Sequence, residues 1–195
     1  MAVLTEEEGT LALALARSAI SHALARTPEA IIPPSRIFSE KRGVFVTLKE
    51  RGELRGCIGF PYPMMPLGAA IRDAAVAAAI EDPRFPPVAR SEIGKIQIEV
   101  TVLTPPVLLE GEPEDRPNRI VIGKHGLIAR GRGMSGLLLP QVPAEWSWGP
   151  EEFLDHTCMK AGLPGKCWKD RAIEFYTFEG RIFTEPESAP PGTGN

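Results

Sequence analysis

The sequence predicts an α+β protein with a mostly antiparallel or mixed sheet and flanking helices. Residues 96–102 alternate apolar and polar side chains, which is the period of a half-buried strand. The β-branched and aromatic run at 43–49 is followed closely by the run at 54–59, as in a β-hairpin. Helical patterns interrupt these strands instead of alternating with them one for one, and this order favours α+β architecture over a parallel α/β sheet.

Three segments have the sequence pattern of helices. Thr5 and Glu8 form a capping-box pattern before a run of leucine and isoleucine at near-helical spacing. Pro66 suits the first position of the second helix, which is rich in alanine, and Pro150 opens the third. Gly162 closes the third helix. The predicted helices cover residues 6–26, 67–80 and 150–161.

Short apolar runs predict the remaining strands. Arg51 and Gly52 supply the turn of the first hairpin. Glycine-rich segments separate three later runs and predict an antiparallel meander, and a last run supplies closing strand material before a frayed tail from Glu185. These later runs are 120–122, 127–129, 137–139 and 173–178, the last continued by Ile182 and Phe183.

The glycines at 131, 133 and 136 match the G-x-G-x-x-G pattern of dinucleotide-binding proteins. They run into the segment 137–140, which ends in proline, and do not open a helix. A pyrophosphate needs the helix N-terminus of that motif, so we interpret these glycines as a hairpin turn.

Length and composition indicate one domain that folds as a compact unit with a small lobe. We expect the domain to cover residues 1–185, followed by a flexible tail at 186–195. The formal net charge of -3 and the absence of basic runs do not indicate a nucleic-acid footprint. Three cysteines without metal-type spacing favour a reducing compartment over a disulfide framework, so we expect a soluble cytoplasmic protein without membrane association. No metal set and no particular cofactor is indicated.

The segment 54–59, Leu-Arg-Gly-Cys-Ile-Gly, is the strongest candidate for a functional site. Gly56 and Gly59 flank the thiol of Cys57 and let the backbone approach a ligand closely. Arg55 lies two positions before Cys57, so in an extended strand both side chains point to one face, where a cation favours thiolate and grips an anion. The alternative is that Cys57 is a small core residue and Arg55 a surface charge.

Polar residues elsewhere are candidates to surround this thiol. His125 stands between two glycines in a predicted turn and, as a neutral imidazole, would act as a base; the alternative is an ordinary turn residue. Glu99 points to the polar face of its predicted strand and is a second candidate base. The candidate ligand-binding residues are Arg55, Gly56, Gly59, Asp82, Arg84, Gln141 and Glu145.

Six blocks in this order resemble the AMMECR domain family, which is named after a human contiguous-gene-deletion region. The blocks are 54–59, 82–85, 99–103, 123–126, 137–141 and 158–163. The resemblance spans about Ser39 to Glu185. It implies an α+β fold of a larger and a smaller lobe, with the motif residues around a cleft between them.

The resemblance also implies an intracellular protein whose partners include Memo-type and radical-SAM proteins. It leaves the activity open and suggests action on nucleic acid, including RNA modification.

Three hypotheses follow for this chain. It is an enzyme that uses Cys57 as nucleophile, with His125 or Glu99 as base, on an anionic substrate such as a nucleotide or RNA. Alternatively it is a non-catalytic ligand-binding or adaptor module with a glycine-lined cleft, or Cys57 and Gly56 only pack a tight hairpin against the alanine-rich helix.

Overall fold

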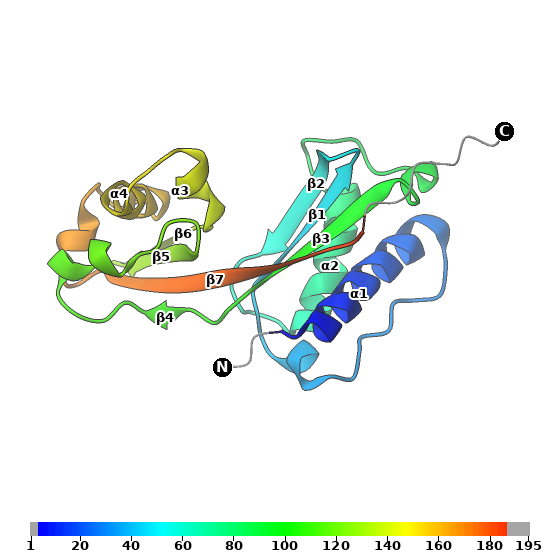
Figure 1. Cartoon of the computed structure of the whole chain (residues 1–195), viewed down its shortest axis with the longest axis horizontal. Coiled ribbons are helices and arrows are strands. Elements are labelled where there is room, and N and C mark those ends of the chain that lie inside the picture. Colours follow the sequence, from blue (N-terminus) through cyan, green and yellow to red (C-terminus); the bar gives the residue numbers. More distant parts are fainter. Residues whose placement is uncertain (1–3, 187–195) are drawn as a thin grey trace. The chain divides into compact units, whose positions relative to one another are not determined.

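The computed structural model of the chain describes residues 4–186, which divide into two compact units (Figure 1). The first unit extends to Leu103 and resumes at Arg181, whereas the second consists of Thr104–Gly180. The second unit is therefore inserted in the sequence of the first. Of the predicted tail at 186–195, only Pro186 lies within the described residues.

Two long helices belong to the first unit. Helix α1 (Glu6–Ala25) begins after Thr5, whose hydroxyl accepts a hydrogen bond from the Glu8 backbone while the Glu8 carboxylate accepts one from the Thr5 backbone. The predicted capping box is thus present. Helix α2 (Leu67–Ile80) has its predicted range, but Pro66 is its N-cap and not its first residue.

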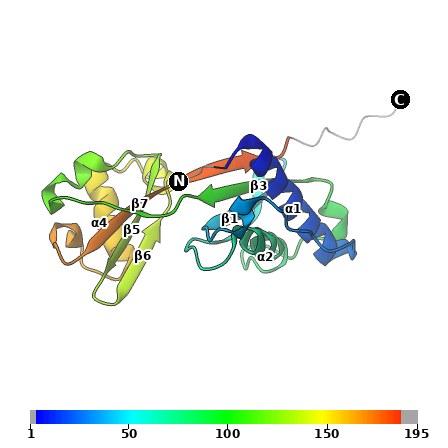
Figure 2. The same ribbon diagram turned by 90° about the horizontal axis from the view of Figure 1, so that it is seen from below.

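The first unit contains the strands β1 (Val44–Glu50), β2 (Glu53–Phe60) and β3 (Ile96–Leu103). They are antiparallel in the order β2-β1-β3, so β2 is the edge strand, and the end of β7 (Glu174–Thr184) follows β3. Alternate residues of β1 and β3 are buried in one core with α1 and α2, which cover one face of these strands (Figure 2). The polar residues between them occupy the other face, as the alternation at 96–102 predicts.

The second unit combines a small sheet with one main helix. Its strands are β4 (Val107–Leu108), β5 (His125–Gly131), β6 (Met134–Leu138) and the first part of β7, in the order β6-β5-β7-β4. Helix α4 (Pro150–Lys160) buries Phe153 and Leu154 in the core of this unit together with Phe175. A short helix, α3 (Gln141–Glu145), precedes it. Short 3-10 helices occur at Arg36–Ser39, Arg90–Glu92, Pro113–Asp115, Pro117–Arg119 and Cys167–Lys169.

Two predictions for the start of the meander are wrong. Residues 120–122 form no strand, because the 3-10 helix before them ends at Ile120 and the carbonyl of Val121 then accepts hydrogen bonds from Lys124 and His125. His125 does not lie in the turn but begins β5, where it pairs with Glu179 of β7. The turn ends at Lys124, two residues before Gly126, which is the second glycine of the predicted turn.

The expectation that the cysteines form no disulfide framework is also wrong, because one disulfide is present. Cys158 at the end of α4 forms a disulfide with Cys167, and the two Cα atoms are 5.8 Å apart. Gly162, with a positive φ of 75°, ends the helix and turns the chain back, which brings the second cysteine to the first. Cys57 is the free cysteine of the chain.

Glu185, where the sequence suggests a frayed tail, is held firmly. Its carboxylate accepts hydrogen bonds from the Arg17 side chain and from the backbone N–H of Ile98, at 2.9 Å. Its carbonyl accepts one from the Gln97 side chain at 2.6 Å. Glu185, directly after β7, is therefore part of the first unit.

Gly56 has a structural role that substitution will test. A Cβ at this position would lie 2.2 Å from the carbonyl oxygen of Ala78, near the end of α2. We expect Gly56→Ala to lower the free energy of unfolding by about 1 to 3 kcal/mol, because strand and helix must separate to admit the methyl group. Urea unfolding measures this change.

Gly94→Ala is the matched control, since no atom lies within 4 Å of the Cβ that it would add. An equal effect of the two substitutions would contradict the close approach of β2 to α2.

Candidate active site on the sheet of the first unit

Three polar side chains form a row across the sheet of the first unit. Thr47 in the middle strand β1 pairs with Cys57 of β2 on one side and with Glu99 of β3 on the other. Directly opposed residues of antiparallel strands point to the same face. All three side chains are half-buried on the face opposite α1 and α2. The fold thus aligns a thiol, a hydroxyl and a carboxylate.

The contacts within this row are polar. The Thr47 hydroxyl donates a hydrogen bond to the Cys57 sulfur at 3.3 Å. The Lys49 ammonium, one step along the same face of β1, lies 3.0 Å from a carboxylate oxygen of Glu99. The Thr184 hydroxyl reaches the same oxygen at 3.5 Å. The thiol of Cys57, the carboxylate of Glu99 and the ammonium group of Lys49 therefore lie on three adjacent strands of one sheet face.

The loop after α2 lies beside β2, on the side that has no neighbouring strand, and forms hydrogen bonds with the backbone of Cys57. The Asp82 carboxylate accepts a hydrogen bond from the Cys57 N–H at 2.8 Å, and the Arg84 guanidinium donates one to the Cys57 carbonyl at 3.1 Å. Arg84 also donates to Asp82 through its backbone and its guanidinium, at 2.7 to 3.1 Å. We call this pair the Asp82–Arg84 clamp. The clamp provides hydrogen-bond partners for the N–H and the carbonyl of Cys57, which have no neighbouring strand on this side.

The clamp is charged at neutral pH. The hydrogen bonds from the Arg84 side chain outweigh the burial of Asp82 and hold the pKa of this carboxyl well below its usual range. The same pairing raises the pKa of Arg84. Asp82 is buried, whereas the Arg84 side chain is 54% exposed, so one side of this guanidinium faces solvent.

Arg55 has a different environment from the one its spacing suggests. The pairing of β1 and β2 shifts between Leu48 and Lys49, which oppose Gly56 and Leu54, so Arg55 is the extra residue of a β-bulge. Its guanidinium donates to the Glu92 carboxylate at 2.9 Å and to the Pro86 carbonyl at 2.9 Å. The hydrogen bonds from Arg55, followed by one from the Ala89 backbone, lower the pKa of Glu92. Arg55 therefore binds the loop that carries the clamp.

Gly56 and Gly59 lie against protein atoms. At Gly56 the space for a side chain is occupied by the Ala78 carbonyl, and at Gly59 by the ring of Phe45 and the carbonyl of Val44. Both glycines permit close packing of the hairpin. The backbone of β2 approaches α2 at Gly56 and β1 at Gly59, whereas the sequence predicts that it approaches a ligand.

The other predicted site residues belong to the second unit. His125 accepts a hydrogen bond at Nδ1 from the Val121 N–H at 3.2 Å, and partial burial lowers the pKa of its imidazole. Gln141 and Glu145 are exposed on α3. The structure thus assembles Cys57, Glu99, Asp82 and Arg84 in the first unit, and a role of His125 beside Cys57 stays a prediction.

Thr47 and Lys49 were not among the sequence candidates. A two-residue turn at Arg51 and Gly52 alone would set Thr47 opposite Gly56, and the bulge at Arg55 moves it opposite Cys57. A bulge has no clear signature in this sequence, so the partner of the thiol was not predictable.

The described part of the chain, residues 4–186, holds neither a cluster of metal ligands nor a helix that could span a membrane. No group of three or more histidine, cysteine, aspartate or glutamate side chains is arranged to hold a metal ion there. Among the helices of that part, none has both the length and the apolar character needed to cross a membrane.

The fold and the site define an α+β protein with a free thiol on the sheet of its first unit. Residues 13–183 match the model of the AMMECR1 family, and the chain belongs to this family. The resemblance seen in the six sequence blocks is thereby confirmed.

Relatives and a solved structure agree with this assignment. The chain is 50% identical to the protein PYRAB00100 of Pyrococcus abyssi, over 95% of this chain and 94% of that protein. It is 51% identical to the protein MK0488 of Methanopyrus kandleri, over 96% and 93%. The crystal structure of the uncharacterized protein PH0010 from Pyrococcus horikoshii matches with a TM-score of 0.79 and 47% identity, covering 96% of each chain. These matches support the predicted α+β fold class.

The clamp gives a prediction about stability and pH. Asp82→Asn removes the charge that Arg84 and the Cys57 N–H share, and we expect a loss of about 2 kcal/mol in the free energy of unfolding at pH 7. Because the Asp82 pKa is lowered in the folded state, its contribution is fully present above the unfolded pKa of about 4 and declines as the pH falls below that value.

Urea unfolding of wild type and Asp82→Asn at several pH values between 3 and 7 measures this difference. The gap between the two proteins should be constant above pH 5 and shrink towards pH 3. A gap that does not depend on pH would contradict a charged clamp.

Proposed function

We propose that this chain is an enzyme in which the Cys57 thiol attacks an electrophilic substrate. The observation that carries the proposal is the row Cys57–Thr47–Glu99, with the Thr47 hydroxyl on the sulfur at 3.3 Å. A hydrogen bond to a thiolate favours the charged form, which is the nucleophile. Glu99, opposite Thr47 in β3, is the proposed acceptor of the thiol proton. In this proposal the Thr47 hydroxyl gives its own proton to Glu99 and takes the proton of the thiol, and Lys49 holds Glu99 in place.

Anionic compounds are the proposed substrates, with a nucleotide favoured over long RNA. Arg84 is half-exposed beside the Cys57 carbonyl, and Lys49 is partly exposed on the same face as the thiol. Both cations suit a phosphate or carboxylate group. A net charge of -3 disfavours binding of a long polyanion, which depends on many cationic contacts. On the basis of the family resemblance we also propose that the protein acts in RNA modification. We further propose that it associates in the cytoplasm with Memo-type or radical-SAM proteins.

Alkylation of Cys57 by iodoacetamide tests the nucleophile. Cys57 is the free cysteine, so labelling of the oxidised protein reports on this site. At neutral pH we expect labelling faster than that of a cysteine peptide, because the Thr47 hydroxyl donates a hydrogen bond to the attacking sulfur. Thr47→Val should slow it by about fivefold, which is the effect of one lost hydrogen bond, and Glu99→Gln should also slow it.

Thr101→Val is the matched control, because Thr101 lies on the same face of β3 as Glu99 but opposite Phe45. Cys57→Ser should take up no label. A wild-type rate equal to that of the peptide and unchanged by Thr47→Val would exclude the nucleophile role.

A binding module without catalysis is the second candidate, and the Asp82–Arg84 clamp favours it. The clamp fixes the backbone around Cys57 without using the thiol, so it would equally support a rigid ligand platform. In that case Cys57→Ser keeps full affinity for a nucleotide probe such as AMP while Arg84→Gln weakens it. An enzyme would lose turnover in Cys57→Ser, so product formation separates the two.

A further inference from the structure

A second row of side chains crosses the first-unit sheet on the face that α1 and α2 do not cover, beside the row that contains Cys57. Phe45 of β1 is opposite Gly59 of β2 and Thr101 of β3. Each of these residues lies two positions from a member of the first row, so both rows share one face. Two residues of a strand span about 7 Å, and a small molecule that touches the sulfur can therefore reach the second row.

The Phe45 ring is held over the backbone of Gly59. A Cβ atom at Gly59 would lie 2.4 Å from Cδ1 and 2.6 Å from Cγ of this ring, so the ring fills the space that a side chain would take. Val44 and Val46 of the same strand are buried on the helical side, whereas Phe45 is half-buried on the open face. The ring therefore offers an apolar surface of fixed position beside the thiol.

Ile182 of β7 adds a second apolar side chain to this face. The Thr184 hydroxyl reaches Glu99 on the open face, and Ile182 lies two residues earlier in the same strand, so its side chain points to that face as well. Phe183, between them, packs on the other side of the sheet against Gly9 of α1. The Ile182 side chain is 59% exposed. A large apolar side chain is thus open to solvent beside the candidate site.

The other side of the thiol is charged. Lys49 lies two residues beyond Thr47 on the same face of β1, and its ammonium group is 3.0 Å from the Glu99 carboxylate. Along β1 the open face therefore changes from an aromatic ring through a hydroxyl to an ammonium group. This order suits a ligand with a flat apolar group at one end and a polar or anionic group at the other, because a few polar groups on an apolar site fix the orientation of a ligand.

We propose that Phe45 and Ile182, here called the apolar row, bind an aromatic ring of the substrate and direct its electrophilic atom towards Cys57. The inference rests on the proposed function and narrows the substrate to aromatic compounds, a class that includes nucleotides. The substrate ring stacks on Phe45, since two aromatic rings attract each other beyond the apolar area that they bury. Ile182 adds apolar contact on the side of β7. Both residues determine specificity and take no part in the proton transfer.

Two electrophiles with the same reacting group test the proposal. Iodoacetamide and N-phenyl iodoacetamide both lose iodide to the Cys57 sulfur, and the second carries a phenyl ring one amide group away from the reacting carbon. The aromatic preference is the labelling rate with the phenyl compound divided by the rate with iodoacetamide, relative to the same quotient for a cysteine peptide. For wild type we expect an aromatic preference of about three to five, the range of one aromatic contact.

Substitutions in the apolar row should change this preference in opposite ways. Phe45→Leu removes the ring and should bring the preference close to that of the peptide, whereas Phe45→Tyr keeps the ring and should retain it. Ile182→Ala should lower it to a smaller extent. The exposed position of Ile182 makes this variant safe for folding, because substitutions at exposed positions usually cost little stability.

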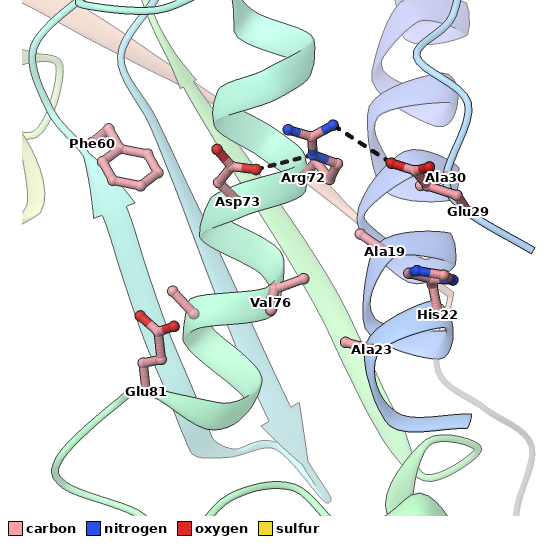
Figure 3. A pocket seen from close by; sticks show the side chains of 11 residues that line it. Ala19, His22, Ala23, Glu29, Ala30, Phe60, Arg72, Asp73, Val76 and Glu81 are labelled. Carbon is pink, nitrogen blue, oxygen red and sulfur yellow. Dashed lines mark hydrogen bonds and ion pairs between the residues drawn. The ribbon is translucent and has the colours of Figure 1, made fainter. Parts of the chain in front are cut away.

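Phe60→Leu is the matched control. Phe60 lies one residue after Gly59 and is also half-buried, but it packs on the helical side of the sheet. There it lines a cavity of about 450 Å³ between α1 and α2 (Figure 3). Its replacement removes an aromatic ring from the same hairpin and should leave the aromatic preference unchanged.

The aromatic preference separates this proposal from the nucleophile role, because both compounds react with the same sulfur. A wild-type preference equal to that of the peptide, or an equal loss in Phe45→Leu and Phe60→Leu, would overturn the apolar row whatever the iodoacetamide rate. A raised preference that Phe45→Leu abolishes, together with an iodoacetamide rate equal to that of the peptide, would support the apolar row and exclude the nucleophile.

Discussion

The hydrogen bonds between the Asp82–Arg84 clamp and the backbone of Cys57 are the constraint on which the candidate site depends. β2 is an edge strand, so the N–H and carbonyl of Cys57 that point away from β1 have no strand partner. The clamp supplies both partners through one charged pair. Without it, the thiol would sit on a strand that is free to fray. The buried carboxylate thus determines how accurately the sulfur faces Thr47.

The bulge at Arg55 links this edge to the chemistry of the row. It changes the partner of Thr47 from Gly56 to Cys57, and it also sends the Arg55 guanidinium to Glu92 and the Pro86 carbonyl. One local irregularity therefore sets the register of the thiol and anchors the loop that carries the clamp. β-Bulges commonly re-aim side chains near functional sites.

The sequence predicted the helices and strands more accurately than the pairs of residues that meet between them. The capping box of α1, the range of α2 and the hairpin of β1 and β2 depend on local patterns, and all three are present. The row of Thr47 and Glu99 beside Cys57 depends on register, which one extra residue alters without a sequence signal. The disulfide of Cys158 and Cys167 depends on how the chain turns at Gly162, and composition carries no such information. His125 lies in β5 and not in the predicted turn for a similar reason, since the turn before β5 ends two residues earlier than predicted.

Strand β7 gives this chain an order of assembly. Residues 104–180 interrupt the first unit, which is completed only when residues 181–185 return to β3 and to Arg17 of α1. During synthesis, the sheet that carries the thiol stays one strand short until residues 181–185 have left the ribosome. The inserted unit is contiguous in sequence, and its sheet is complete once the first part of β7 has been made. A nascent chain therefore acquires its disulfide-bearing part before its thiol-bearing part is finished.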